Sequence, residues 1–144
     1  MNPKRAVVAG LIGTTAMTAL WLVEPKLGLA RFAAGDMLSS LLAVMTAYAS
    51  LGPALGWGLH FAVGIILALL YAARFMGRLP GSPLTRGLLY GCLIFLIAQL
   101  LFMPLVGAGM FSRGDPSMLL GSLIGHLAYG GLVGLICGTP PETS

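Results

Sequence analysis

The sequence predicts an all-α membrane protein that is a bundle of four transmembrane helices. Of its 144 residues, 58% are hydrophobic and only 8% are charged, and the mean hydropathy is +0.95. A soluble domain carries about a quarter charged residues, so a surface this apolar suits a lipid bilayer. Four long stretches of the chain contain no charged residue, and each is close to the roughly 20 residues that a helix needs to cross the hydrocarbon core.

The uncharged stretches define the expected spans, which are 6–24, 56–74, 87–105 and 117–137. They are expected to be helical because backbone groups in lipid must find their hydrogen-bond partners within the protein. The alternating pattern of a membrane barrel strand is absent. We therefore treat residues 1–144 as a single integral membrane domain.

The basic residues indicate how the chain is oriented. Lys4 and Arg5 precede the first span, and three arginines crowd the loop 75–86. Basic residues collect on the cytoplasmic side of a membrane, whereas the other two loops mix basic with acidic residues. This predicts a multi-pass protein of the bacterial inner membrane with cytoplasmic N and C termini. The net charge of +4 is explained by this placement and gives no reason to expect nucleic acid as a partner.

The chain contains a duplicated hairpin. The segments "PKLGLARFAAGD" (25–36) and "PLVGAGMFSRGD" (104–115) share proline, two glycines, phenylalanine and aspartate at the same five places. Similar order before and after these loops predicts two helix–loop–helix repeats, at about 5–76 and about 86–138. Both would enter the membrane from the same side, as parallel repeats do.

The segment "MLSSLLAVMTAYASL" (37–51) has no counterpart of equal length in the second half. At about 1.5 Å per residue it is short for a crossing. We expect an extra short helix that lies in the interface or re-enters the membrane. A fifth span is the alternative, and it would place the arginine-rich loop outside.

The second helix of each repeat carries a histidine followed by small residues at every fourth position, so that the histidine and the small residues form a stripe on one helix face. Such stripes allow helices to approach closely, so we predict two helix-packing faces. They are Gly64, Ala68 and Ala72 below His60, and Gly130, Gly134 and Gly138 below His126.

His60 and His126 are the ionisable groups inside the expected spans, and such groups are functional candidates. They could make interhelical hydrogen bonds, ligate a b-type haem through its two axial positions, or line a transport path. The stripes favour the structural interpretation, because a haem needs helices held apart. We expect no cofactor, with haem b as the alternative, and no metal site, because a histidine pair without a supporting carboxylate is a weak metal signal.

The remaining polar residues offer no catalytic set. Asp36 and Asp115 each follow glycine and precede an expected helix, which is typical of helix caps. Glu24 lies at the membrane edge with Lys26 as its expected neighbour. No nucleophile–base pair, carboxylate pair or phosphate loop is recognisable, so we expect no enzyme and name no catalytic residue.

Small residues outside the two stripes suggest a role in assembly. These residues are Gly10, Gly13, Gly121 and Gly125. We expect them to face partners within the lipid bilayer, which are either other membrane subunits or a second copy of the chain. The leading functional hypothesis is a non-catalytic structural or accessory subunit of a larger bacterial inner-membrane assembly, such as an electron-transport complex. The alternatives are a small haem-b or quinone-site electron-transfer protein that uses both histidines, and a small homo-oligomeric transporter or channel.

The stretches "GPALGWGLHFAVG" (52–64) and "GSLIGHLAYGGLVG" (121–134) carry a resemblance. In these two stretches the chain resembles an uncharacterised bacterial family of small, multi-span membrane proteins of roughly 140 residues, which is catalogued as a domain of unknown function. The likeness runs from about residue 6 to residue 138. It implies an integral inner-membrane protein and brings no activity, cofactor or catalytic residue.

Overall fold

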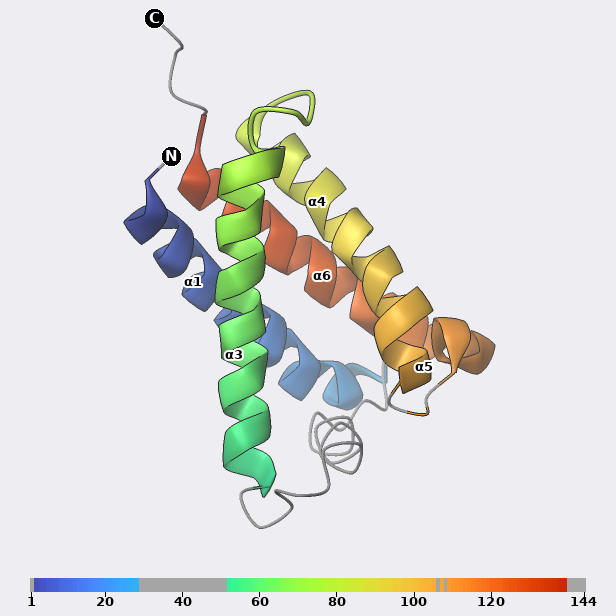
Figure 1. Ribbon diagram of the computed structural model, residues 1–144. Helices are drawn as coiled ribbons and strands as arrows, with labels where there is room; N and C mark the ends of the chain where they lie inside the picture. The colour runs from blue at the N-terminus through green and yellow to red at the C-terminus, as the bar shows by residue number, and fades with distance from the viewer. Residues whose placement is uncertain (1, 29–51, 106, 108, 140–144) are drawn as a thin grey trace, which may run out of the picture.

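The computed structural model describes residues 2–28, 52–105, 107 and 109–139, and the regular structure within these ranges is entirely helical (Figure 1). In chain order the elements are α1 (Pro3–Val23), a 3-10 turn (Glu24–Leu27), α3 (Gly52–Leu70), a π-helical turn (Tyr71–Phe75), α4 (Pro83–Ile97), a second π-helical turn (Ala98–Phe102), α5 (Met103–Leu105), a 3-10 turn (Met110–Gly114) and α6 (Pro116–Cys137).

Four of these helices are long and apolar enough to cross a membrane, which indicates a membrane protein. They cover Pro3–Val23, Trp57–Phe75, Pro83–Leu105 and Pro116–Cys137. The four expected spans are therefore confirmed as helices. The first and third begin a few residues earlier than expected, because the capping residues Asn2 and Ser82 each precede a proline, which fits the first helical turn.

The cap predicted at Asp115 is present. Its Oδ1 accepts hydrogen bonds from the backbone N–H groups of Ser117 at 2.9 Å and Met118 at 3.3 Å, so two of the orphan donors at the start of α6 are satisfied. The other predicted cap, Asp36, and the predicted helix at 37–51 lie outside the described residues.

The four long helices form the expected bundle, which is closed at one end and open at the other. α6 packs against both α1 and α4, and α1 packs against α3. The two outer helices meet near one end, where Tyr90 on α4 donates a hydrogen bond to the carbonyl of Leu67 on α3 at 2.9 Å and packs on the rings of Tyr71 and Phe75. Towards the other end α3 and α4 diverge (Figure 1).

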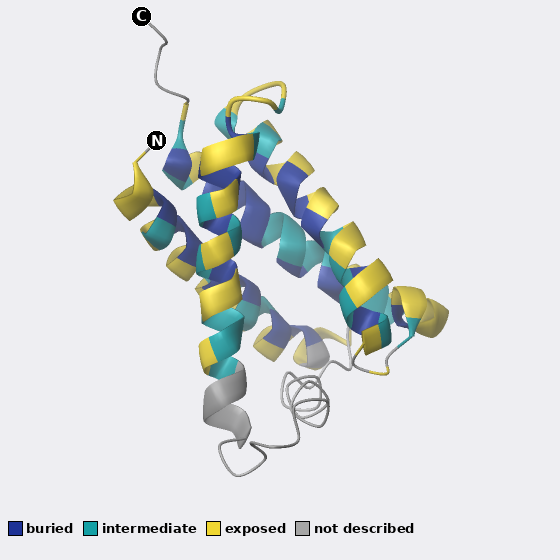
Figure 2. Cartoon of the chain, in the orientation of Figure 1, coloured by how far each residue is buried: buried dark blue, intermediate teal, exposed yellow. Residues whose placement is uncertain are grey.

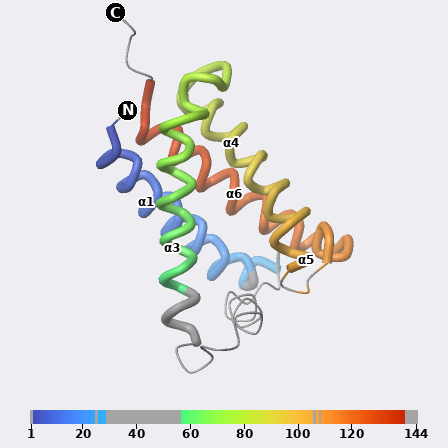
Figure 3. Tube along the Cα trace, viewed as in Figure 1, coloured from blue at the N-terminus to red at the C-terminus, as the bar shows by residue number. Residues whose placement is uncertain are grey.

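Both ends of the described chain lie at the end of the molecule where α3 and α4 meet (Figure 3). The Arg5 guanidinium approaches Gly138, which ends α6 with a φ of 77°. The turn from α3 to α4 lies at this same end and carries Arg74 and Arg78. Arg5, Arg74 and Arg78 thus lie at one end of the molecule, which we call the basic end.

Small residues bring the helices into close contact. On α6, a Cβ added to Gly130 would lie 2.7 Å from the Cα of Gly91 on α4. On α1, a Cβ added to Gly10 would lie 2.7 Å from the Cα of Ile65 on α3. Real Cβ atoms do not approach this closely, so backbone contacts hold both helix pairs together. The stripes that begin at Gly64 and Gly130 lie in these contacts.

The glycines expected to face partners are buried within the chain. A Cβ on Gly13 would meet the ring of Tyr129 at 2.9 Å, and one on Gly125 would meet the indole nitrogen of Trp21 at 2.8 Å. Gly10 contacts α3, as described, and Gly121 is also buried. This corrects the expectation of an open partner face on these residues, because contacts within the bundle of four helices use them internally.

The burial pattern matches a lipid-facing exterior. Inward helix faces are buried and outward faces are exposed (Figure 2), and many large apolar side chains lie on the outside, among them Leu22, Ile66 and Leu101. In lipid such exposure has no hydrophobic penalty. The duplication of the hairpin stays a prediction, since most of its first loop lies outside the described residues.

Candidate functional site

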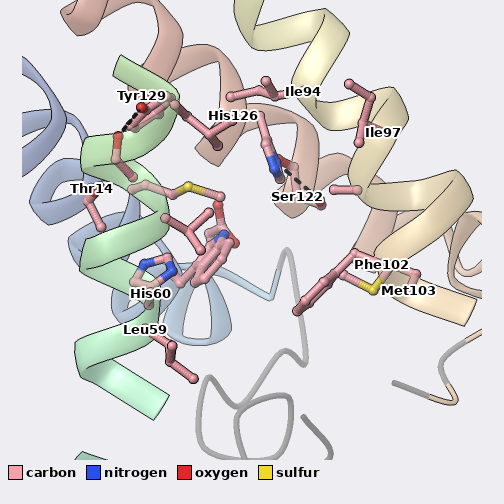
Figure 4. Close-up of a pocket in the computed structure, with 17 residues that line it drawn as sticks. Thr14, Leu59, His60, Ile94, Ile97, Phe102, Met103, Ser122, His126 and Tyr129 are labelled. Carbon is pink, nitrogen blue, oxygen red and sulfur yellow. Dashed lines mark hydrogen bonds between the residues drawn. The ribbon is translucent and has the colours of Figure 1, made fainter. Parts of the chain in front are cut away.

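A cavity of about 310 Å³ opens where α3 and α4 diverge (Figure 4). Its wall comes from the second half of α1 with the turn after it, the middle of α3, the end of α4 with the following turn and α5, and the middle of α6. Most of the wall is apolar. Its polar members are Thr14, Glu24, His60, Ser122, His126 and Tyr129. The structure therefore brings both predicted histidines to one cavity.

His60 forms the α1–α3 side of the cavity. Its ring stacks on the indole of Trp21, with centroids 5.4 Å apart and planes at 30°, and its Nε2 is 3.1 Å from the Thr18 hydroxyl of α1. Trp57 packs edge-on at 6.0 Å. The imidazole thus makes an interhelical hydrogen bond and has its ring fixed by aromatic neighbours.

His126 is held by its own helix. Its Nδ1 is 2.7 Å from the backbone carbonyl of Ser122, and a carbonyl only accepts, so Nδ1 carries the proton. In the neutral ring Nε2 is then an acceptor, and it makes no hydrogen bond within the described residues. The ring packs edge-on against Phe95 of α4 at 5.9 Å. One nitrogen of His126 therefore remains available at the cavity.

A buried polar network lies behind this histidine. The Ser112 hydroxyl donates to Gln99 Oε1 at 3.1 Å, and Gln99 Nε2 donates to the Ser122 hydroxyl at 3.0 Å. Gln99 is completely buried and lies in the π-helical turn after α4, a distortion frequent at functional sites. The network connects the loop before α6 to the residue that holds His126. The sequence gives one indication of this network, which is the polar amide of Gln99 in the middle of an apolar span.

The loop that supplies Ser112 is strained. Phe111, Ser112 and Arg113 have φ values of 48°, 50° and 53°, in the left-handed region that costs about 1–3 kcal/mol per non-glycine residue. The Ser112–Gln99 bond and a bond from Arg113 Nη2 to the Gly107 carbonyl at 3.1 Å hold the turn in this form.

Glu24 is the acidic residue of the cavity wall. It is 3% exposed, and neither carboxylate oxygen has a hydrogen-bond partner. Burial raises the pKa of this carboxyl above its ordinary value of 4.5, because a charged form loses water without gaining a partner. The sequence places Glu24 at the membrane edge but gives no sign that it enters a cavity.

Two further polar side chains of the wall, Tyr129 and Thr14, were not predicted as site residues. Tyr129 of α6 is buried and donates from its hydroxyl to the backbone carbonyl of Gly64 on α3. Thr14 of α1 is buried with no partner for its hydroxyl oxygen. Both depend on contacts between helices that are far apart in the chain, which no local pattern encodes.

The composition of the cavity wall resembles that of a small-molecule site. Among the described residues no group of three or more His, Cys, Asp and Glu side chains could hold a metal ion. Cys92 is exposed and Cys137 is buried, and both are free thiols. What remains is an apolar space with a few polar atoms on its wall, which is the usual form of a small-molecule site.

Searches of the curated proteins and of the solved structures find no match to the chain. A family model described as "Family of unknown function (DUF6789)" matches residues 1–142. This match spans nearly the whole chain, including all four apolar helices and the cavity between them. The chain therefore belongs to DUF6789, a family whose function is unknown.

Proposed function

We propose that the protein is a non-catalytic integral membrane subunit that holds a small amphipathic molecule. The observation that carries this proposal is the cavity of about 310 Å³, lined by apolar side chains together with His60, His126 and Glu24. Ligand pockets have volumes of about 300–1,000 Å³ and place a few polar groups on a mainly apolar wall.

The position of the cavity supports the same conclusion. Its lining residues lie where α3 and α4, which meet near Tyr90, have diverged, away from Arg5, Arg74 and Arg78. The packed end keeps the helices together through glycine contacts, so the divergent end does not depend on a filled interior. A molecule dissolved in the bilayer has an apolar body and would meet the apolar wall directly.

We place the subunit in the bacterial inner membrane, with both termini and residues 76–82 in the cytoplasm. Arg5, Arg74, Arg78 and Arg86 support this orientation through the positive-inside rule. The turn from α3 to α4 is too short to form a domain outside the membrane. This favours action within a larger membrane assembly, with the bound molecule passed to or shared with a partner.

The test is native mass spectrometry of the protein extracted with its surrounding lipid. Ala98 lines the cavity, so Ala98→Phe should fill it and remove a co-purifying small molecule. Ala73→Phe makes the same change at an exposed position and should retain that molecule. The proposal would be contradicted if both variants carried equal amounts of the small molecule, or if the wild type carried none.

A haem-b or quinone-site electron-transfer protein is the second candidate. The observation in its favour is that His60 and His126 line one cavity from different helices. Protein purified from haem-replete cells should then show a Soret band that His126→Ala abolishes. A colourless preparation excludes the haem form, and the mass spectra above identify a bound quinone if one is present.

A further inference from the structure

The acidic residue of the cavity points to the charge of the ligand, an inference that rests on the proposed function. Glu24 is 3% exposed, lines the cavity and has no hydrogen-bond partner on either oxygen. Ionised carboxylates are buried in proteins only when paired with a cation or with hydrogen-bond donors. The site is therefore incomplete as it stands, and either a proton or a bound cation completes it.

Among the described residues, no lysine or arginine fills this role. The described lining residues include no lysine or arginine. The titratable groups that share the cavity with Glu24 are His60 on α3 and His126 and Tyr129 on α6, while Lys26 on its own turn is exposed. Glu24 also caps the C-terminal end of α1, where the helix dipole is negative and favours cations.

The other residues of the cavity wall indicate what else the ligand must contain besides a positive charge. Apolar side chains such as Val63, Ile94 and Met103 surround the space, so the ligand has an apolar body. His126 Nδ1 donates to the Ser122 carbonyl at 2.7 Å, which leaves Nε2 as an acceptor for a donor on the ligand. One acid and one acceptor on an apolar wall match an N–H-bearing ammonium group.

We propose that the cavity binds an amphipathic amine in its protonated form, with the Glu24 carboxylate as counter-ion and His126 Nε2 as a second acceptor. The ammonium and a proton compete for the same carboxylate. Binding of the cation therefore releases the proton of Glu24, and affinity rises with pH until the amine itself loses its charge.

The experiment is isothermal titration calorimetry on the protein in zwitterionic nanodiscs, with empty nanodiscs as the blank. The probes are benzyldimethylamine, the permanent cation benzyltrimethylammonium, and its neutral carbon analogue neopentylbenzene. At about pH 8 we expect wild type to bind both cations more tightly than neopentylbenzene, and the amine most tightly. Glu24→Gln should weaken both cations by about tenfold or more, the loss expected for a charge-assisted contact, and leave neopentylbenzene unchanged.

Two comparisons isolate the contribution of Glu24. Asp115→Asn removes the other described carboxylate at this end of the molecule while retaining a good capping residue, and it should bind the probes as wild type does. Affinity of benzyltrimethylammonium should fall between about pH 8 and about pH 5 in wild type. This fall should be smaller in Glu24→Gln, which has no Glu24 carboxylate for a proton to compete for.

The outcomes separate this inference from the proposed function. If neopentylbenzene binds as tightly as the cations and Glu24→Gln changes nothing, the inference is wrong while a ligand-binding cavity stands. If none of the probes binds and Ala98→Phe also leaves the native load unchanged, the proposed function fails as well. Should Glu24→Gln prove unfolded, a pH-independent affinity of wild type for benzyltrimethylammonium overturns the inference.

Discussion

The polar side chains around the cavity differ in whether they have hydrogen-bond partners. His60 and His126 each use one ring nitrogen in a hydrogen bond and pack their rings on aromatic neighbours. Glu24 and Thr14 are buried with no hydrogen-bond partner. A buried unsatisfied polar group costs about 1–3 kcal/mol, and a charged one more. Such costs persist where function needs them, which makes Glu24 the most informative residue of the wall.

Glu24 should make stability depend on pH. Burial raises the pKa of its carboxyl above 4.5, so the folded chain holds the proton more tightly than the unfolded chain. The contribution to stability is fully present below the unfolded value and is lost as pH rises through the folded pKa. Thermal unfolding in detergent should show lower stability above that window. Glu24→Gln should have a flatter profile and greater stability at about pH 8; a parallel profile would show that Glu24 is solvated.

Gln99 should stabilise the fold through its two serine partners. Gln99→Leu leaves the hydroxyls of Ser112 and Ser122 without their amide partner, and we expect a loss of about 1–3 kcal/mol. In a double-mutant cycle with Ser112→Ala, measured by reversible unfolding in mixed micelles, the losses should be less than additive. Full additivity would mean that the two side chains act independently.

At the scale of the helix, glycine decides which faces meet. Gly130→Ala would place a methyl group 2.7 Å from the Cα of Gly91 and against the Gly87 carbonyl, so α4 and α6 would have to separate. We expect a loss of at least about 2 kcal/mol, as for overpacking elsewhere. Gly58→Ala on α3 is the matched control, because nothing lies within 4 Å of the added Cβ, and it should be neutral or slightly stabilising. Equal unfolding midpoints for the two variants would contradict the packing.

The elements themselves were largely predictable from the sequence. Uncharged stretches between Arg5 and Glu24 or between Arg86 and Arg113 are physically sufficient to locate spans, since the bilayer sets their length. The cap at Asp115 was also readable, because a proline after an aspartate is a local signal.

The packing partners were not predictable in the same way. Spacing by four shows that Gly64 and Gly130 lie on small-residue faces but not which helix they meet. Gly13 and Gly125 were expected to face partners, although Tyr129 and Trp21 of the same chain cover them. Nor does any local pattern show that α3 and α4 diverge, so the cavity and the role of Glu24 in its wall required the three-dimensional arrangement.

At the scale of the whole molecule, the four long helices bring both ends of the described chain to the basic end. The residues that line the cavity lie towards the other end, where α3 and α4 diverge. The helix contacts differ between the two ends. Near the basic end, helix backbones touch at glycines. Beyond Tyr90, side chains surround the cavity. Ligand binding should therefore change the divergent end of the helices more than the closely packed end, with reduced hydrogen exchange in 57–63 and 94–103 and little change in 83–91.

The topology is the most direct test of the central claim that this is a four-span membrane protein with its basic end in the cytoplasm. Single cysteines at Gly77 and Lys26, both exposed, are introduced in a background without Cys92 and Cys137, the two native cysteines. A membrane-impermeant maleimide is then applied to intact bacterial cells and to permeabilised ones. We expect Lys26→Cys to be labelled in intact cells and Gly77→Cys only after permeabilisation. Labelling of both positions in intact cells would contradict the four-span topology.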